Sequence, residues 1–107
     1  MIIAISSDKK DLKEPVSEIF GRSLWFCLYN TETQKVEFLE NVAGATIQNA
    51  GAKTVDFLQK LGVNAVLSGR FGTRTTVLLR KNNIQLIIPQ RIKTLNEIIN
   101  QLKNKKS

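Results

Sequence analysis

The residues best suited to chemistry lie in one short stretch, residues 64–76, with the sequence NAVLSGRFGTRTT. An apolar run stops at Ser68, and Gly69 and Gly72 then lead into a hydroxyl-rich segment that predicts the start of a helix. Glycines let backbone N–H groups approach a ligand closely, and a helix N-terminus offers unpaired donors and a partial positive charge. The pattern is equally compatible with a binding site for an anion or small ligand and with a plain strand–helix turn that has a threonine cap.

Positive charge accompanies this glycine loop. Arg70 and Arg74 flank it, next to Thr73, and the glycine spacing matches neither of the common nucleotide-binding loops. Residues 1–56 contain six Lys/Arg and eight Asp/Glu, whereas residues 57–107 contain ten and one, within a net charge of +7. A basic half of this kind is typical of proteins that bind an anionic cofactor, a phosphate ester or nucleic acid.

The residue types that are missing limit the possible chemistry. The chain has no histidine and one cysteine, Cys27, so a monomer cannot assemble a conventional zinc or iron–sulfur site. Cys27 lies in an aromatic-rich run and is interpreted first as a packed residue, which leaves it a weak candidate as a metal ligand. Ser6, Ser7 and Ser68 have no histidine to act as base. We therefore expect that the protein is not an enzyme.

Length and composition indicate a single domain. The 107 residues are 42% apolar, which is ordinary for a globular protein, and we expect the domain to cover residues 1–103 with a basic tail at 104–107. No apolar run approaches the roughly 20 residues that span a bilayer, so no membrane partner is expected. A single cysteine fits a cytoplasmic location.

The hydrophobic pattern predicts an α/β domain in the order β-β-β-α-β-α-β-α. Short strand–helix–strand connections imply parallel pairing, and an early hairpin adds one antiparallel strand. The result is a mixed five-stranded sheet flanked by about three helices. The expected strands are residues 1–6, 24–30, 35–40, 65–67 and 84–88, and the expected helices are residues 47–61, 75–81 and a last segment that begins after Thr94.

Three loops should meet at one end of this sheet. Ligands of open α/β sheets bind beyond the carboxyl ends of the parallel strands, where we expect residues 6–8, 41–51 and 69–73. Arg22 has two possible roles, because it could face these loops or pair with a hairpin acid such as Glu37. The convergence of loops favours the glycine segment as a binding site over a simple turn.

Several motifs follow one another along residues 1–90 in a recognisable order. They are Phe20-Gly21-Arg22, an acidic hairpin ending in Glu40-Asn41, the small pair Ala50-Gly51, Leu58 to Val63, and the two glycines of residues 69–72. Together they resemble the dinitrogenase iron–molybdenum cofactor biosynthesis family. The resemblance implies a small ribonuclease H-like domain that carries or stores an iron–molybdenum or iron–sulfur cluster, or a precursor of one.

The chain also departs from that family. Residues 48–51 are Gln-Asn-Ala-Gly where a His or Ser followed by Gly-Ala-Gly is common, and Thr73-Arg74 replace a frequent Pro and Asn. Without histidine, a cluster would be held by backbone amides and arginines. The expected ligand-binding residues are Arg22, Asn49, Gly51, Gly69, Arg70, Gly72, Thr73 and Arg74.

Three functions remain open at this point. Binding of an anionic metal cluster or cofactor precursor ranks first, because it joins the loops, the arginines and the resemblance. Association with nucleic acid ranks lower, since no recognised reader motif accompanies the basic half. A scaffold that pairs with a protein partner through a sheet edge or the hairpin is the third. Nuclease activity is not expected, because the strands at residues 1–6 and 65–67 contain no acid for a metal.

Overall fold

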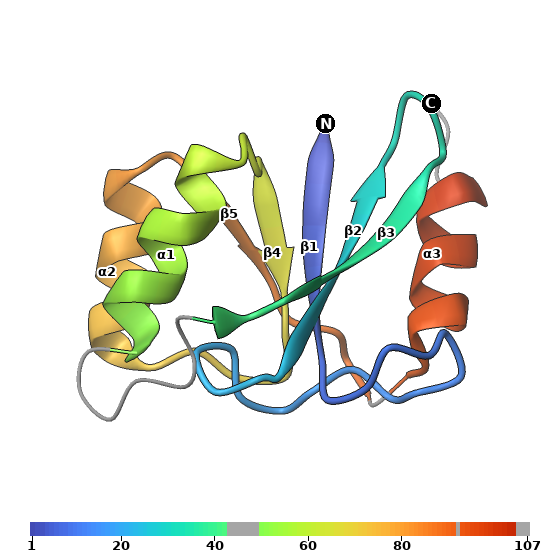
Figure 1. Cartoon of the computed structure of the whole chain (residues 1–107), viewed down its shortest axis with the longest axis horizontal. Coiled ribbons are helices and arrows are strands. Elements are labelled where there is room, and N and C mark those ends of the chain that lie inside the picture. Colours follow the sequence, from blue (N-terminus) through green and yellow to red (C-terminus); the bar gives the residue numbers. More distant parts are fainter. Residues whose placement is uncertain (43–49, 92, 105–107) are drawn as a thin grey trace.

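A five-stranded sheet runs through the centre of the molecule, with helices on both faces (Figure 1). The computed structural model describes residues 1–42, 50–91 and 93–104. In chain order the elements are β1 (Ile2–Ser7), β2 (Trp25–Asn30), β3 (Val36–Glu40), α1 (Ala50–Lys60), β4 (Ala65–Leu67), α2 (Thr73–Lys81), β5 (Gln85–Ile87) and α3 (Leu95–Asn104). The predicted element order is confirmed, and the start predicted for the first helix, residue 47, lies outside the described residues.

The sheet has the strand order β3-β2-β1-β4-β5. Strand β1 pairs in parallel with β4, and β4 with β5, while β2 is antiparallel to both β1 and β3. Strand β2 is therefore the one strand of the described sheet that runs against the others, as the hairpin predicts. The mixed sheet is confirmed, and the ribonuclease H-like assignment stays a prediction.

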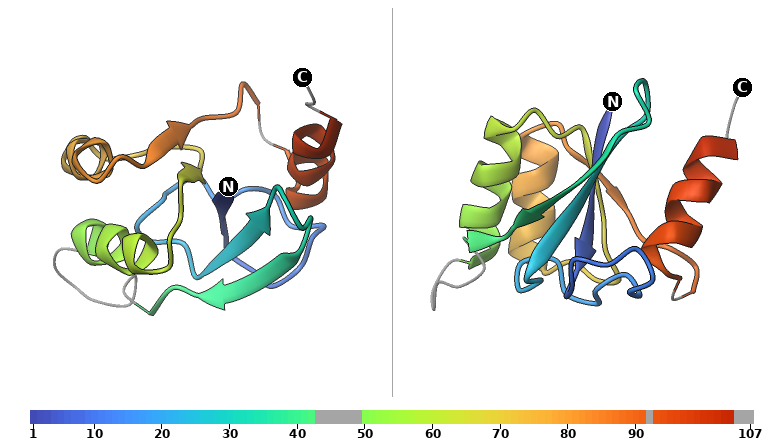
Figure 2. Two further views of the ribbon diagram at one scale, coloured as in Figure 1. Left: turned by 90° about the horizontal axis from the view of Figure 1, so that it is seen from above. Right: turned by 45° about the vertical axis from the view of Figure 1, so that its right-hand side comes forward.

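Apolar side chains form a layer on each face of the sheet. Because side chains alternate along a strand, Ile3 and Ile5 of β1 face α3, whereas Ala4 faces α1 and α2. Figure 2 shows α1 and α2 covering one face and α3 the other. Each large side chain buried in these layers stabilises the fold by roughly 1.5–3 kcal/mol. No helix in the described ranges is long and apolar enough to cross a bilayer.

Two helix ends follow the sequence signals. Gly62 has a φ of +78°, a left-handed conformation that favours glycine just after α1. Thr94 caps α3: its Oγ1 accepts the Glu97 N–H at 3.1 Å, and the Glu97 carboxylate accepts the Thr94 N–H at 3.0 Å. Both predicted caps are confirmed, so local sequence sets where these helices end and begin.

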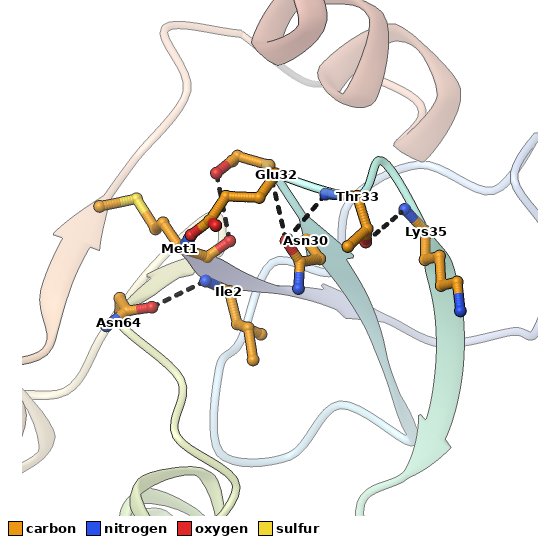
Figure 3. A network of polar contacts seen from close by, with 8 residues as sticks. Met1, Ile2, Asn30, Glu32, Thr33, Lys35 and Asn64 are labelled. Carbon is orange, nitrogen blue, oxygen red and sulfur yellow. Dashed lines mark hydrogen bonds and ion pairs between the residues drawn. The ribbon is translucent and has the colours of Figure 1, made fainter.

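Polar contacts close the end of the sheet where β1 begins (Figure 3). The Ile2 N–H donates to Asn64 Oδ1 at 2.7 Å, which ties β1 to the start of β4. The N-terminal ammonium lies 3.2 Å from a Glu32 carboxylate oxygen, and Asn30 Oδ1 accepts the Glu32 N–H in the hairpin turn. Of the loops expected to bind a ligand, residues 6–8 and 69–73 lie at the opposite end (Figure 1).

Candidate functional site at the carboxyl ends of the parallel strands

A segment of the long loop between β1 and β2 crosses the carboxyl ends of β1 and β4, at the bottom of Figure 1. The Ser17 N–H donates to the Ser6 carbonyl at 2.8 Å, and the Gly69 N–H donates to the Ser17 carbonyl at 3.0 Å. Ser68 Oγ donates to that same carbonyl at 3.2 Å. The loop after β1 and the glycine loop are thus joined through Ser17, a link that the sequence pattern did not indicate.

Gly69 is in close contact with this crossing segment. A Cβ added at Gly69 would lie 2.8 Å from Glu18 Cα and 3.1 Å from the Glu18 carbonyl oxygen. These are backbone atoms, which cannot rotate away as the end of a side chain can. Since its N–H already donates to Ser17, Gly69 shapes the loop and is not a free donor for a ligand.

Gly72 has a different environment, at the N-terminus of α2. It is the N-cap residue, with φ −68° and ψ 157°, and no side chain caps the helix. Its carbonyl accepts the Thr76 N–H at 2.9 Å and Thr76 Oγ1 at 3.0 Å. The threonine cap of the simple-turn interpretation is therefore absent from α2. The first N–H groups of a helix have no acceptor within the helix, so those of Thr73 and its neighbours are candidate ligand donors.

The first turns of α1 and α2 lie against each other. A Cβ added at Gly51 would collide with Thr75 Oγ1, so glycine at this position lets the two turns approach. Both helices begin at the end of the sheet where the parallel strands finish (Figure 1). Two partial positive charges are thus brought together. Asn49, the other residue expected here, lies outside the described residues.

A buried amide positions the start of α1 relative to the sheet. Asn41 follows β3, and its Nδ2 donates to the carbonyls of Ser23 at 2.9 Å and Gly21 at 3.4 Å. Its Oδ1 accepts Thr54 Oγ1 of α1 at 3.3 Å. This role of Asn41 and Thr54 was not predicted from the sequence. Its one sequence signal is an asparagine directly after a strand with alternating side chains.

A buried hydroxyl at the same end lacks a partner. Ser6 is fully buried, and its Oγ makes no hydrogen bond within the described ranges. Ser6 has the same parity along β1 as Ala4, whose side chain packs on the face covered by α1 and α2. An unsatisfied buried hydroxyl costs roughly 1–3 kcal/mol, and such groups often mark a place where a ligand or water completes the bonding.

Arg70 lies beside an open cleft next to the glycine loop. The cleft has a volume of about 390 Å³, and its described lining residues are Val16, Glu18, Gly69, Arg70, Pro89, Gln90 and Arg91. It combines two exposed arginines with one exposed glutamate. Gly51, Gly72, Thr73, Arg74 and Arg22 are not among these lining residues. Of the expected site residues, Gly69 and Arg70 thus line the cleft, whereas Gly51, Gly72, Thr73 and Arg74 lie at the starts of α1 and α2.

Basic residues lie at both ends of α2. Arg74 belongs to the first turn, whereas Arg80 and Lys81 belong to the last. At a rise of about 1.5 Å per residue, Arg80 lies about 9 Å farther along the helix axis than Arg74. Arg22 is exposed in the loop that precedes β2. Only part of the positive charge seen in the sequence is thus gathered at the carboxyl ends of the strands.

Direct metal ligation is poorly supported by the described side chains. Cys27 is fully buried on β2, opposite Ile5 and Phe38, and burial raises the pKa of its thiol to about 12. The thiolate needed for metal binding is therefore scarce at neutral pH. Within residues 1–42, 50–91 and 93–104, no group of three or more Cys, Asp and Glu side chains is placed to hold a metal ion.

The sequence as a whole matches one protein family. The family model described as "Dinitrogenase iron-molybdenum cofactor" covers residues 1–105. The chain belongs to this family. The resemblance inferred from the motifs is therefore confirmed for this family member, which matches no curated protein at a significant level.

Solved structures with the same fold include three that cover most of this family member. A putative NifB protein from Thermotoga, assigned to the DUF35 family, is 29% identical over 97% of this chain and 88% of its own, with a TM-score of 0.81. The apo orange protein from Desulfovibrio gigas is 20% identical over 94% and 84%, also at 0.81. The protein PH0822 is 22% identical over 99% and 93%, again at 0.81. The similarity to the orange protein and to PH0822 shows a shared fold.

Proposed function

We propose that this family member binds an anionic metal cluster, or a precursor of one, as cargo and does not act as an enzyme. The observation that carries the proposal is the contact between the first turns of α1 and α2 at the carboxyl ends of the parallel strands. Arg70 and Arg74 flank the loop that leads into α2. Membership of the iron–molybdenum cofactor family supports an iron–molybdenum or iron–sulfur cluster as the cargo.

The chemistry of the site suits a large anion. Backbone N–H groups at Gly72 and Thr73 donate to sulfide or oxide atoms of the cargo, and the arginine side chains balance its charge. Each favourable contact between an anion and a helix N-terminus contributes typically 0.3–1 kcal/mol. The buried Ser6 hydroxyl, which has no hydrogen-bond partner among the described residues, is a further candidate donor.

Holding the cargo without metal–protein bonds has a functional consequence. Breaking a coordinate bond to a thiolate or imidazole is slow, whereas a cluster held by charge and hydrogen bonds leaves by simple dissociation. This favours a carrier that receives and passes on its cargo. We place the function in the cytoplasm, because a reducing compartment fits a chain with one free, buried thiol.

Charge removal at each end of α2 tests this proposal. The double variant Arg70→Gln/Arg74→Gln removes two charges beside the proposed site, and Arg80→Gln/Lys81→Gln, which removes two exposed charges in the last turn of α2, is the matched control. Isolated iron–molybdenum cofactor is mixed with each protein under anaerobic conditions, and protein-bound molybdenum is measured after ultrafiltration. We expect Arg70→Gln/Arg74→Gln to bind at least about tenfold more weakly, which corresponds to about 1.4 kcal/mol, and the control to change little.

Two results count against the proposal. One is equal affinity in all three proteins, provided that circular dichroism shows the same fold. The other is a loss of binding that is as large in the control, Arg80→Gln/Lys81→Gln, as in Arg70→Gln/Arg74→Gln, because general attraction to a basic protein would then explain it.

A further inference from the structure

The face of the sheet that α3 covers has an open side. Figure 2 shows α3 and β5 standing apart in the view from above. Between them lies a groove of about 530 Å³, with apolar walls from Leu67, Ile87, Ile98 and Leu102. Ile88 also lines this groove and is 60% exposed. The groove is separate from the proposed cluster site, apart from a shared border at Pro89 and Gln90.

The outer edge of β5 borders this groove and is open. Within the described sheet β5 is the last strand and pairs only with β4. The Gln85 N–H donates to the Asn64 carbonyl at 3.0 Å, and the Ile87 carbonyl accepts the Ser68 N–H at 3.2 Å. Because backbone groups alternate in direction along a strand, those of Leu86 face away from β4. An extended chain can therefore hydrogen-bond to this edge.

The polar rim of the groove carries one charged side chain among its described lining residues, the basic Lys93. Lys93 donates from Nζ to Gln101 Oε1 at 3.0 Å, and exposed Arg91 lines the neighbouring cleft. The acid of α3 nearest in sequence, Glu97, is engaged with Thr94 at the helix cap. A second copy of the chain would bring a net charge of +7 to this surface and would be repelled, whereas an acidic partner would be attracted.

We propose that this groove binds an extended, acidic segment of a partner protein, which adds a strand to β5. Alternate apolar side chains of that segment enter the groove beside Ile87 and Leu102, and an acidic residue faces Lys93. Strand addition of this kind draws affinity from main-chain hydrogen bonds and specificity from the side-chain pocket. The proposal does not depend on cluster binding, because it uses the opposite side of β5 from α2.

The free edge of β5 is long enough to pair with only a short segment. Strand β5 has 3 residues, and Pro89 shortly follows it and has no N–H to donate. A brief edge with a following proline is a common protection against uncontrolled pairing. The partner is thus held mainly by one or two apolar anchors and a few backbone hydrogen bonds.

A synthetic peptide tests the proposal. The probe is a capped, fluorescein-labelled hexapeptide in which valine alternates with glutamate, and a version with lysine in place of glutamate is its charge control. A third peptide carries N-methyl groups on alternate residues and cannot form the strand. We expect saturable binding of the glutamate peptide, with amide shifts centred on residues 85–88 and 93–102. Both control peptides should bind at least about tenfold more weakly.

Two matched protein variants locate the binding. Ile88 and Val77 are both 60% exposed, but Val77 lies on α2, away from the groove. Ile88→Asp should weaken binding of the glutamate peptide at least about tenfold, while Val77→Asp should leave it nearly unchanged. Because both side chains are exposed, neither substitution removes buried core.

Three outcomes would overturn the proposal. They are absence of saturable binding, equal binding of the acidic and N-methylated peptides, and amide shifts located elsewhere, for example on β3. Sedimentation of the free protein tests the remaining possible occupant of the groove, a second copy of the chain. If the chain self-associates and Ile88→Asp abolishes that association, a second copy fills the groove.

Discussion

At the scale of single residues, two glycines of the same loop have opposite environments. A Cβ added at Gly69 would lie 2.8 Å from Glu18 Cα, whereas the nearest atom to a Cβ added at Gly72 is Thr75 Oγ1, 3.9 Å away. We expect Gly69→Ala to lower the free energy of unfolding by about 1–3 kcal/mol through overpacking. Gly72→Ala should change it by less than about 0.5 kcal/mol, because its backbone conformation suits alanine. Urea denaturation of both variants measures this difference, and equal losses would contradict it.

Cys27 makes stability depend on pH in the alkaline range. Its pKa is about 12 in the fold, while an exposed thiol has a pKa of about 8.5. The unfolded chain therefore releases this proton first, so the contribution of Cys27 is complete below about pH 8.5 and is lost as pH rises. We expect the free energy of unfolding to fall by up to about 1.4 kcal/mol per pH unit above that point.

The variant Cys27→Ala isolates this effect, because all other titrating groups are shared. The stability difference between the two proteins should drift in favour of Cys27→Ala as pH rises from 8 to 10 (about two pH units). In parallel, a thiol reagent should label the native protein slowly and the unfolded protein fast. Rapid labelling of the folded protein at neutral pH would show that the thiol is accessible.

At the scale of elements, the Asn41 side chain joins the end of β3, the loop before β2, and α1. Thr54→Val removes the hydroxyl that donates to Asn41 Oδ1 and keeps a similar volume, so we expect a loss of about 1 kcal/mol of unfolding free energy. Asn41→Ala also leaves the Ser23 carbonyl without its donor and should cost clearly more. Thermal unfolding of both variants shows which loss of stability is larger. A larger loss in Thr54→Val than in Asn41→Ala would contradict this role of the Asn41 side chain.

Helix α3 depends on its capping box. Thr94→Ala removes the acceptor for the Glu97 N–H and should lower the free energy of unfolding by about 1 kcal/mol. The pKa of Glu97 lies below its usual range, chiefly because its carboxylate accepts the Thr94 backbone N–H and then the Thr94 hydroxyl. Its contribution is thus present above the ordinary pKa of Glu and lost as pH falls through the lowered value. In Thr94→Ala, NMR titration should show a higher pKa for Glu97 than in the wild-type protein. An unchanged pKa would contradict the capping box.

The elements themselves could be predicted because their signals are local. Alternation along residues 35–40, the glycine at Gly62 and the Thr94–Glu97 spacing each act within a few residues. The crossing segment could not be predicted in the same way. Its contacts join Ser17 to Ser6 and Gly69, which are far apart in the chain. An irregular loop has no hydrophobic periodicity from which such contacts could be predicted.

The candidate site was predicted only in outline for the same reason. Glycine in a loop indicates close approach, but the sequence does not say whether a ligand or the chain itself approaches. At Gly69 it is the Glu18 backbone, and at Gly51 it is Thr75 of the neighbouring helix. Burial of Cys27 agrees with its interpretation as a packed residue. The orphan hydroxyl of Ser6 carries no sequence signal, because serine is common at strand ends.

At the scale of the whole molecule, the two ends of the sheet differ in construction. The end where β1 begins is tied by short polar contacts such as the one between Ile2 and Asn64. The other end gathers two helix N-termini, an open cleft and Arg70 and Arg91. The basic half of the sequence is divided between this end, the far end of α2 and the rim of the β5 groove. Division of the charge favours two separate acidic or anionic partners over one long nucleic-acid strand.

The most direct test of cluster binding is to locate the residues at which it occurs. Isolated iron–molybdenum cofactor is titrated anaerobically into the isotope-labelled protein, with molybdate as a simple anion control, and backbone amides are followed by NMR. We expect saturable changes concentrated at Gly51 and residues 69–75, with smaller effects from molybdate. Unchanged spectra, or changes confined to the β5 groove or the last turn of α2, would contradict the proposed site.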